Sequence, residues 1–482
     1  MDRIKAFFAP PKASAEEYEP LADDDSGTLE GSIYEEGTPF SWIEYSIFAL
    51  IGVAMLWAWN MFLAAAPYFQ TRFQSDPWIY ANSQSAIIST STIINLVAMM
   101  ALTRIQSSAN YPLRINIALL MNVAVFAMLT ISTTSAFLDA SPKLYLAFLL
   151  LMVALTASAA GLMQNGAFSF VASFGRPEYT QAIMVGQGIA GILPPLTQMF
   201  SYLAFADPSP GIPPPGQPSS ESNSSSPPQN DEGATSAFIY FLTAVLISAL
   251  TFAAFIPLVR RHSRLVSRRR GSLGPSPGTD LSQSTATLHS TTSASEPTAP
   301  TRRHIPLTTL FLKLRWLAAA VAMCFVVAMF FPVFTAKILS VHDSPAGGGL
   351  FSPGAFIPLG FFFWNLGDLA GRVSAVLPPF AWLRARPRVL FVVGLARWGF
   401  LPLYLLCNLH GRGAVVESDL FYLGVVQFPF GLTNGWLGSS AMMAAGEWVG
   451  EDEREAAGGF MGMCLVGGLA LGSVLSFTAA GV

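Results

Sequence analysis

The sequence predicts an all-α membrane protein with eleven transmembrane helices. Of its 482 residues, 52% are hydrophobic and 11% are charged, about half the charged fraction usual for soluble domains. About 20 helical residues cross the hydrocarbon core of a bilayer, and mainly apolar runs of this length recur along the chain. A β-barrel would instead show alternating segments of about ten residues. The predicted spans are 44–69, 79–103, 115–137, 144–173, 180–206, 236–259, 316–335, 354–379, 388–408, 420–446 and 456–480.

The distribution of Lys and Arg predicts how these helices are oriented. Cytoplasmic segments of membrane proteins carry an excess of both residues. With the N-terminus placed in the cytosol, cytosolic segments hold 20 of the 26 Lys and Arg residues, and two more lie inside spans. The other side holds four, namely Arg72, Lys143, Lys337 and Arg412. We therefore expect a cytosolic N-terminus and an extracytosolic C-terminus, as an odd number of helices requires.

Two hydrophilic stretches divide the predicted helices into two bundles, six and five. Residues 1–43 form an acidic cytosolic tail that lacks the apolar core of a signal peptide, and we expect it to be disordered. An N-terminal bundle over 44–259 contains a Pro/Ser-rich, disordered outer loop at 207–235. A basic, Ser/Thr-rich cytosolic linker covers 260–315, and the C-terminal bundle covers 316–482. This order is typical of transporters that bind substrate between two bundles.

Three segments outside the spans carry candidate signals. Asn223 begins the one N-x-[ST] match and lies on the side where glycosylation occurs. The basic end of the linker is interpreted as a positive-inside anchor that binds anionic lipid, with regulated phosphorylation as the alternative. Residues Tyr18 to Leu21 (YEPL) fit a tyrosine-based sorting pattern, which favours a vacuolar or endolysosomal membrane over the plasma membrane.

The predicted span 354–379 carries opposite charges near its middle. Asp368 and Arg372 are four residues apart, so they share one helix face, with Asn365 one turn earlier. A charge at the bilayer centre costs about 2.5–3.5 kcal/mol, so both should face protein or water. A carboxylate and a guanidinium suit a polar, uncharged substrate; the alternative is an ion pair that only fixes helix packing. Arg397 is alone in its span, and we expect it to brace a neighbouring carbonyl or carboxylate.

The first span carries a second polar site, and two later spans carry amides. Asn60 follows Trp59, and Pro67 should interrupt the helix late. Trp59 lies deep in its span, where a cavity-facing indole offers a flat surface for a planar ring; the alternative is a Trp at the lipid interface. Gln164 and Gln187 are amides that need partners once buried.

The sequence favours transport that uses no ATP or cofactor. No G-x-x-x-x-G-K-[ST] loop is present, and Cys324, Cys407 and Cys464 have no metal-like spacing. No Ser-His, paired-Asp or His-metal cluster lies within the spans, so an intramembrane hydrolase is disfavoured. We expect neither a metal nor a nucleic-acid partner. Arg372 should keep Asp368 charged, which favours uncoupled over proton-coupled movement.

At the polar motifs around Asp368 and Trp59, and at further motifs along the chain, the sequence resembles the equilibrative nucleoside transporter family. The matching motifs occur in the same order over nearly the whole chain. The chain differs from the family mainly in its short first outer loop and in the sequence AWN at a position where PWN is common. It implies a fold like the major facilitator superfamily without its twelfth helix. It also implies facilitated diffusion of nucleosides by alternating access. The motifs that carry it are WNMFLAAAPYF, GQGIAG, MFFPVFTAKI, FWNLGDLAGR, LARWGFLPLYLLCN, FGLTNGWLGSSAMM and EREAAGGFMGMCLVGGLALGSVLSF.

The resemblance also implies roles for particular residues. Asp368 and Arg372, with Asn365, would engage the ribose, and Gln164 would hydrogen-bond the base. The residues implied to line the base side are Leu56, Trp59, Asn60 and Leu63. The residues implied to shape or close the cavity are Phe331, Pro332 and Asn434, with Arg397 beside them.

Three other functions stay open from the sequence. One is a sugar or drug carrier of the wider major facilitator superfamily, which would not carry uridine or adenosine. Another is proton-coupled export of nucleosides from an acidic organelle. The third is a membrane receptor or scaffold, which would keep its function after loss of Asp368.

Overall fold

The computed structural model describes residues 40–105, 109–134, 141–205, 229–272, 305–342 and 349–479. These residues form helices joined by turns, with one isolated antiparallel bridge between Ile338 and Leu409. The longer helices are α2 (Trp42–Ala64), α4 (Pro77–Arg104), α5 (Tyr111–Ser132), α6 (Pro142–Ala172), α7 (Pro177–Phe205), α8 (Gln229–Ser272), α9 (Leu307–Ala328), α11 (Pro353–Ser374), α13 (Pro387–Ala396), α15 (Phe428–Ala445) and α16 (Arg454–Ser476). The shorter ones are α3 (Ala66–Arg72), α10 (Phe330–Thr335), α12 (Pro378–Arg384), η2 (Arg397–Gly399), α14 (Phe400–Tyr404), η3 (Phe421–Gln427), η4 (Glu451–Glu453) and η5 (Phe477–Ala479).

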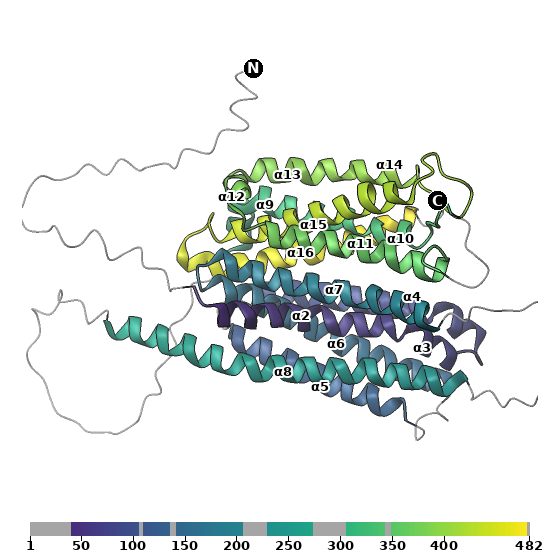
Figure 1. Ribbon diagram of the computed structural model, residues 1–482. Helices are drawn as coiled ribbons and strands as arrows, with labels where there is room; N and C mark the ends of the chain where they lie inside the picture. Colours follow the sequence, from purple (N-terminus) through teal and green to yellow (C-terminus); the bar gives the residue numbers. More distant parts are fainter. Residues whose placement is uncertain are drawn as a thin grey trace, which may run out of the picture.

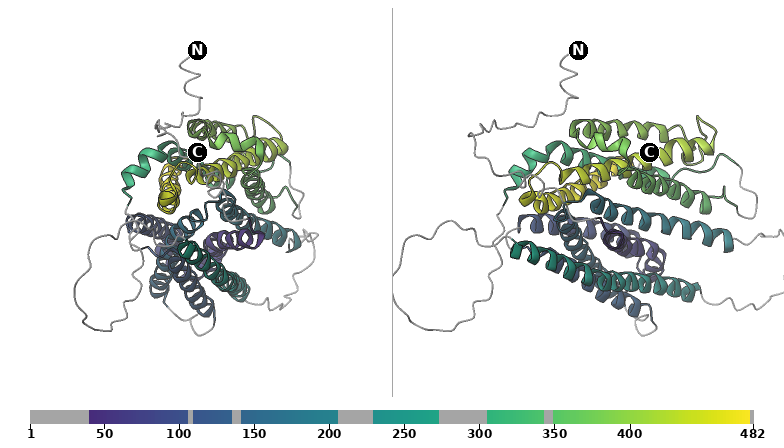
Figure 2. Two further views of the ribbon diagram at one scale, coloured as in Figure 1. Left: turned by 90° about the vertical axis from the view of Figure 1, so that its left-hand side faces the viewer. Right: turned by 60° about the vertical axis from the view of Figure 1, so that its left-hand side comes forward.

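The helices form two layers that follow the order of the sequence. In Figure 1 the purple to teal helices α2 to α8 lie below the green to yellow helices α9 to α16. The two views of Figure 2 show the same separation. Contacts between the layers are made mainly by α7 with α11 and α15, and by α4 and α6 with α16. We call the layers the N-bundle and the C-bundle.

Among the described residues, eight helical stretches are long and apolar enough to cross a membrane. The three remaining predicted spans are also helical but are polar or interrupted: α11 carries the charged pair, α13 gives way to η2 and α14, and the π-helical η3 precedes α15. The eight stretches are Trp42–Ala64, Pro77–Arg104, Tyr111–Ser132, Pro142–Ala172, Pro177–Leu203, Ala234–Arg264, Leu307–Thr335 and Glu451–Ala479.

Large apolar side chains are exposed in the middle of several of these helices. Ile93 is 61% exposed, Leu246 is 60% exposed and Leu120 is 52% exposed. In water such positions would be unfavourable, whereas lipid tails solvate them. Their exposure agrees with a helical membrane protein.

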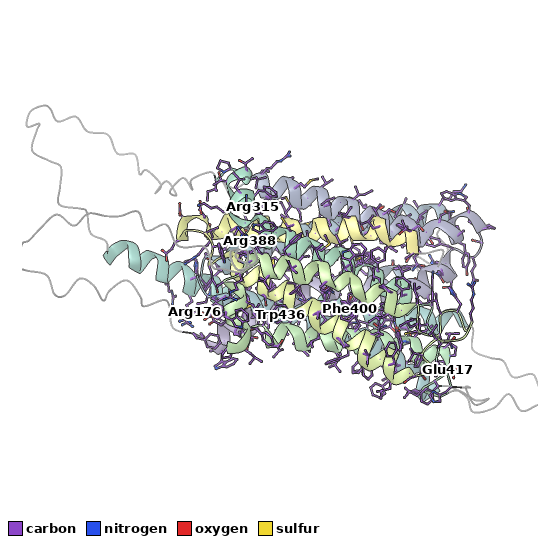
Figure 3. All side chains as sticks on the ribbon, turned by 90° about the horizontal axis from the view of Figure 1, so that it is seen from above. Arg176, Arg315, Arg388, Phe400, Glu417 and Trp436 are labelled. Atoms are coloured by element: carbon purple, nitrogen blue, oxygen red, sulfur yellow. The ribbon has the colours of Figure 1, made fainter. Side chains whose placement is uncertain are left out.

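Basic side chains gather at one end of the molecule. Arg176, Arg315 and Arg388 lie together at that end in Figure 3, and Glu417 lies at the other. We call these the basic end and the opposite end. The basic end holds the starts of α2, α7 and α9 and the ends of α4, α6 and α15, as the course of the chain in Figure 1 shows.

The buried core shared by the two bundles lies mainly at the basic end. One cluster combines N-bundle residues such as Phe168 and Tyr179 with C-bundle residues such as Leu314 and Met442. A second cluster consists only of N-bundle residues. A third belongs to the C-bundle, with Met199 of α7 as its one buried N-bundle member. The bundles therefore share most of their apolar packing at the basic end, while at the opposite end the contact is made by α7 through Met199.

Several boundaries differ from the sequence prediction. α8 continues to Ser272 and α9 begins at Leu307, so both ends of the predicted linker 260–315 are helical. Arg and Leu are good helix formers, and basic groups are favourable at a helix C-terminus. The predicted late break of the first helix is confirmed: α2 ends at Ala64, and α3 carries Pro67 in its first turn. Asn223 and the YEPL segment lie outside the described residues.

Candidate functional site

A cavity of about 430 Å³ lies between the two bundles. Its walls come from α2, α4, α5, α6 and α7 of the N-bundle and from α9, α10, α11, α15 and α16 of the C-bundle. Most of the lining is apolar, with a small number of polar side chains. This size and lining are typical of sites for small organic ligands.

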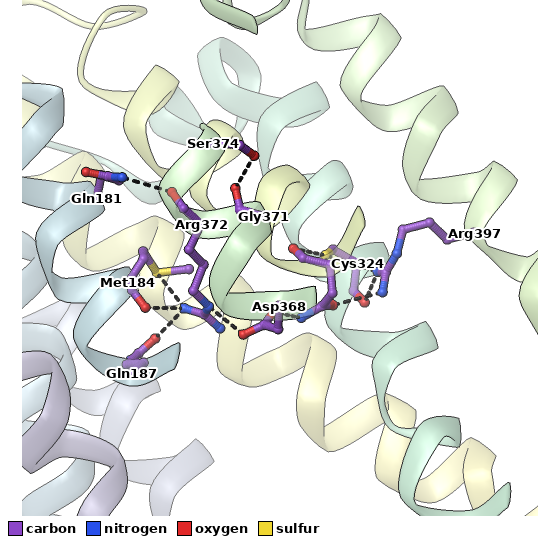
Figure 4. A network of polar contacts seen from close by, with 10 residues as sticks. Gln181, Met184, Gln187, Cys324, Asp368, Gly371, Arg372, Ser374 and Arg397 are labelled. Carbon is purple, nitrogen blue, oxygen red and sulfur yellow. Dashed lines mark hydrogen bonds and ion pairs between the residues drawn. The ribbon is translucent and has the colours of Figure 1, made fainter. Parts of the chain in front are cut away.

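The charged pair of α11 lies in the wall of this cavity. Arg372 Nε donates to Asp368 Oδ2 at 2.6 Å, and the two side chains are one helical turn apart (Figure 4). Both residues are buried, at 3% and 6% exposure for Asp368 and Arg372. Their pairing satisfies both charges within the protein, which is the condition for placing them inside a membrane.

Arg372 also links the C-bundle to the N-bundle. Its Nη1 donates to the Met184 carbonyl at 2.8 Å and to Gln187 Oε1 at 3.2 Å, both on α7. In return Gln181 Nε2 donates to the Arg372 carbonyl at 2.9 Å (Figure 4). Among the described residues no hydrogen-bond partner of Arg372 Nη2 is found. This donor is therefore available to a ligand.

The carboxylate of Asp368 is held from its other side by α15. Asn434 Nδ2 donates to Asp368 Oδ1 at 2.7 Å. The contact depends on close packing of α11 against α15, because a Cβ on any of four glycines would lie 1.8–2.2 Å from a backbone oxygen of the facing helix. Only residues without a side chain allow this approach. The four glycines are Gly367, Gly371, Gly431 and Gly435.

Arg397 continues the network behind the cavity wall. Its Nη2 donates to Asn434 Oδ1 at 2.9 Å, and its Nη1 donates to the Cys324 carbonyl at 2.6 Å. Its guanidinium carbon lies 5.0 Å from the centre of the Phe430 ring. Arg397 is 1% exposed and is not part of the cavity lining. The expectation that it braces a neighbouring carbonyl agrees with these contacts.

Aromatic side chains form apolar parts of the cavity wall. Phe331 of α10 stacks on Trp364 of α11, with ring centres 4.1 Å apart and planes 9° apart. The neighbouring Pro332 also lines the cavity, and Trp59 faces it from α2. Trp364 Nε1 is buried without a hydrogen-bond partner among the described residues. An indole beside a cavity offers both a flat face and a donor.

Most of the residues selected from the sequence meet at this cavity. Among the described residues, Asn365 and Gln164 line it as expected, and Asn365 Nδ2 donates to the Phe361 carbonyl at 2.8 Å. Gln164 makes no side-chain hydrogen bond to a described residue. The selected residues that line the cavity are Leu56, Trp59, Gln164, Phe331, Pro332, Asn365, Asp368, Arg372 and Asn434.

Two residues expected on the base side lie elsewhere. Asn60 turns towards α7, where its Nδ2 donates to the Ala190 carbonyl at 2.8 Å. Leu63 is 45% exposed and borders a separate hollow with Gln70 and Gln84 near the end of α2. The expectation that they line the cavity is corrected, because successive residues of a helix point about 100° apart and α2 ends at Ala64.

Sequence reasoning missed several polar residues of the N-bundle wall, including Ser91 and Thr92 of α4 and three with unpaired side-chain oxygens. Asn95 of α4, Asn122 of α5 and Thr156 of α6 all line the cavity. Each has a buried side-chain oxygen with no hydrogen-bond partner among the described residues. Neutral residues of this kind are common in membrane helices, so only their three-dimensional convergence distinguishes them. Within the described ranges, no group of three His, Cys, Asp or Glu side chains could hold a metal ion.

Solved structures show the fold of the chain. It aligns with a crystal structure of the major facilitator superfamily transporter FucP in the outward conformation, with a TM-score of 0.52, 16% identity and coverage of 91% of this chain and 92% of FucP. It also aligns with a bacterial homologue of the iron transporter ferroportin in its outward-facing state, with a TM-score of 0.51, 11% identity and coverage of 92% of each chain. The chain therefore has a fold of the major facilitator type.

Similar proteins and a family model show to which protein family the chain is related. The chain is 30% identical over 472 residues to the Nucleoside transporter FUN26 of Saccharomyces cerevisiae, covering 90% of this chain and 83% of the relative. It is 25% identical over 476 residues to the Equilibrative nucleoside transporter 1 of Homo sapiens, covering 89% and 95%. The family model described as Nucleoside transporter matches residues 150–213 and 225–480. The chain therefore belongs to the nucleoside transporter family.

Proposed function

We propose that this protein carries nucleosides across a membrane by facilitated diffusion, binding them in the cavity between its two bundles. The observation that carries the proposal is the buried Asp368–Arg372 pair, which lines a cavity bounded by both bundles in a chain of the nucleoside transporter family. A transporter of this type needs a site that both bundles can enclose in turn.

The C-bundle wall suits the ribose. Each oxygen of a carboxylate has two acceptor positions, and Asp368 uses one on each oxygen for Arg372 and Asn434. The remaining positions can accept from ribose hydroxyls, and Arg372 Nη2 can donate to the ring or hydroxyl oxygens. Asn365 is one turn away and keeps its Oδ1 for a further contact. The base would then extend towards Trp59 and Gln164 of the N-bundle.

The packing of the bundles supports alternating access, with most of the contact between them at the basic end. The large shared core lies at the basic end, while at the opposite end Met199 of α7 is the one buried N-bundle residue in the C-bundle core. The cavity lining extends along α16 from Leu465 to Ser473, towards the opposite end. A change of access requires the bundles to part at the basic end, so contacts such as Gln181 to the Arg372 carbonyl must break.

The test is uptake of radiolabelled uridine and adenosine into vesicles that contain the purified protein. We expect saturable uptake that glucose does not inhibit. Asp368→Asn and Arg372→Ala should each reduce uptake at least tenfold, whereas the control Arg384→Gln, at the basic end, should retain it. Uptake no faster than in empty vesicles, or unchanged in both variants, would overturn the proposal. A steep rise of uptake on imposing a pH gradient would favour the proton-coupled alternative.

We further propose eleven spans with the N-terminus in the cytosol. The three interrupted helical stretches supply the spans beyond the eight apolar ones, and the cluster of Arg residues at the basic end supports the orientation. An epitope inserted between residues 273 and 304 should be accessible only from the cytosol, and one after Val482 only from the other side. Accessibility of both epitopes from the same side would contradict five spans in the C-bundle.

The membrane and its lipids are part of the proposal. Arg260 lies on α8 near the basic end, where anionic lipid can neutralise its charge. We propose residence in a vacuolar or endolysosomal membrane, directed by the YEPL segment. A Tyr18→Ala variant should move to the plasma membrane in cell imaging, and unchanged localisation would remove this support.

A further inference from the structure

The N-bundle wall of the cavity contains polar groups that the protein leaves unsatisfied. Asn122 is 3% exposed and Thr156 is 5% exposed, and both line the cavity. The oxygens Asn122 Oδ1, Thr156 Oγ1 and Asn95 Oδ1 have no hydrogen-bond partner among the described residues. Buried polar atoms are nearly always paired. Unpaired oxygens that line a ligand cavity therefore indicate a group supplied by the ligand.

Thr156 differs from other buried threonines of the same protein. A helical Thr usually donates its hydroxyl to the carbonyl four residues earlier. Thr103, Thr130 and Thr251 do so, at 2.6, 2.7 and 2.7 Å. Thr156 does not make this bond. Its hydroxyl is therefore free to bind a group in the cavity.

The packing of α5 against α6 brings Asn122 and Thr156 to a similar height along the helix axes. The two helices run in opposite directions, and Arg114 Nη1 donates to Asn165 Oδ1 near the basic end. Asn122 lies eight residues after Arg114, and Thr156 lies nine residues before Asn165. At about 1.5 Å per residue these steps differ by less than about 2 Å. The two side chains therefore lie at a similar depth, and both line the cavity.

Asn95 lies in the same wall of the cavity, towards the basic end. A Cβ on Gly161 would lie 3.4 Å from Asn95 Oδ1, so Asn95 lies beside Gly161. Gly161 is five residues after Thr156 and three before Gln164. The polar groups thus form a column along α6, in the wall of the same cavity as the Asp368–Arg372 pair.

We propose that Asn122, Thr156 and Asn95 form a subsite for the hydrogen-bonding edge of the nucleobase, and that it prefers bases with an exocyclic amino group. The inference rests on the proposed function and adds a substrate preference to it. An amide oxygen only accepts hydrogen bonds, and a hydroxyl can accept or donate. An amino group supplies two N–H donors to these oxygens, and Thr156 can donate to the adjacent ring nitrogen. A base with a carbonyl there would place its lone pairs against the amide oxygens.

The test compares adenosine with inosine, which carry the same ribose but an amino group or a carbonyl at one position of the base. Vesicles with the full-length protein would be used to measure the ratio of kcat/KM for the two nucleosides in competition. Wild type should prefer adenosine, and Thr156→Val and Asn122→Leu should each reduce the preference about 3- to 10-fold, the value of roughly one hydrogen bond. Because the readout is a ratio, a variant that yields less folded protein still reports it.

Matched variants separate the subsite from general effects on the helices. Thr156→Ser keeps the hydroxyl and should keep the ratio. Thr130→Val removes a hydroxyl that is bonded within α5 and lies outside the cavity, so it should also keep the ratio.

The outcomes distinguish this inference from the proposed function. Uptake of both nucleosides with a ratio unchanged in Thr156→Val and Asn122→Leu would overturn the subsite alone. A preference for inosine that these variants abolish would overturn the amino-group assignment, since it would mean that the Asn122 amide presents its nitrogen. Wild-type vesicles that carry neither nucleoside would overturn the proposed function and this inference with it.

Discussion

The two walls of the cavity satisfy their polar groups in different ways. On the C-bundle wall, Asp368 binds Arg372 and Asn434, and Asn434 binds Arg397 behind it. On the N-bundle wall, the side-chain oxygens of Asn122 and Thr156 have no partner among the described residues. On one wall the charges are paired with each other and keep some hydrogen-bonding positions for a ligand, and on the other the neutral groups have no partner in the described part of the protein.

The difference follows from the cost of each kind of group inside a membrane. A buried charge without a partner costs several kcal/mol, so the protein must provide its partners before a ligand arrives. An unpaired neutral oxygen costs only about 1–3 kcal/mol. A binding site can therefore leave neutral groups for its ligand, but it must hold its charges in a prepared geometry. Substitutions on the first wall should reduce stability and transport together, and those on the second should reduce transport alone.

The largest effect is expected for Asp368→Ala. The change leaves the charge of Arg372 buried without its carboxylate, which should lower the free energy of unfolding by about 3–5 kcal/mol. Transport should fall below about 1% of wild type. Nucleoside uptake and thermal unfolding of the purified protein measure both quantities. Asp368→Asn keeps an acceptor oxygen and should be more stable than Asp368→Ala; equal stability of wild type and Asp368→Ala would contradict the paired-charge interpretation.

Arg397→Leu should have the next largest effect, although Arg397 does not line the cavity. The variant removes the donors to the Cys324 carbonyl and to Asn434 Oδ1, at about 1–3 kcal/mol for a buried acceptor left unpaired. Because Asn434 also holds Asp368, uptake should fall about tenfold. Arg397→Lys retains one donor group, so its stability and uptake should lie between those of wild type and Arg397→Leu. A variant with full stability and reduced uptake would place Arg397 in substrate binding instead.

Gln164→Leu tests the N-bundle wall of the cavity. Its side chain makes no hydrogen bond to a described residue, so the thermal unfolding temperature should stay within about 2 °C of wild type, an effect under about 1 kcal/mol. The KM for nucleosides should rise about 3- to 10-fold through loss of one ligand hydrogen bond. Destabilisation as large as that of Asp368→Ala would show that the two walls do not differ.

The smallest effect is expected for an ion pair near water, between Arg384 Nε and Glu447 Oε1 at 3.4 Å. Burial raises the pKa of Glu447 above its usual value of 4.5, and Arg384 partly opposes the shift. The folded state therefore binds the proton more tightly than the unfolded state. The contribution of Glu447 to stability is fully present below pH 4.5 and is lost as the pH rises through the folded pKa. Thermal unfolding from acid towards neutral pH should show this decline, by less than about 1 kcal/mol.

Glu447→Gln is the control for that pH dependence. The variant has no titrating group at this position, so its stability should be flatter over the same pH range. A decline of stability as steep in the variant as in wild type would assign the effect to another carboxylate. The comparison also separates a pair near water from the deeply buried pair of α11.

Features that depend on one helix could be predicted from the sequence. The apolar runs give the helices, because each must be long and apolar enough to cross the bilayer. Asp368 and Arg372 lie four residues apart, so their contact follows from helix geometry alone. The break before Pro67 is equally local.

Features that need two helices were decided only by the tertiary structure. Arg114 lies at the edge of the predicted span 115–137, yet it is 9% exposed and donates to Asn165 of α6 and to backbone carbonyls. The turning of Asn60 towards α7 and the presence of both Asn122 and Thr156 in the cavity wall likewise depend on how neighbouring helices are rotated and aligned. No local pattern specifies that rotation or alignment.

The sequence by itself determined that this is a helical membrane protein with a charged pair on one helix face, because hydropathy and helical periodicity are properties of single segments. The tertiary structure decided which side chains share the cavity and which of them have partners. Those outcomes depend on close packing between helices, as where Gly435 brings α15 against Asp368.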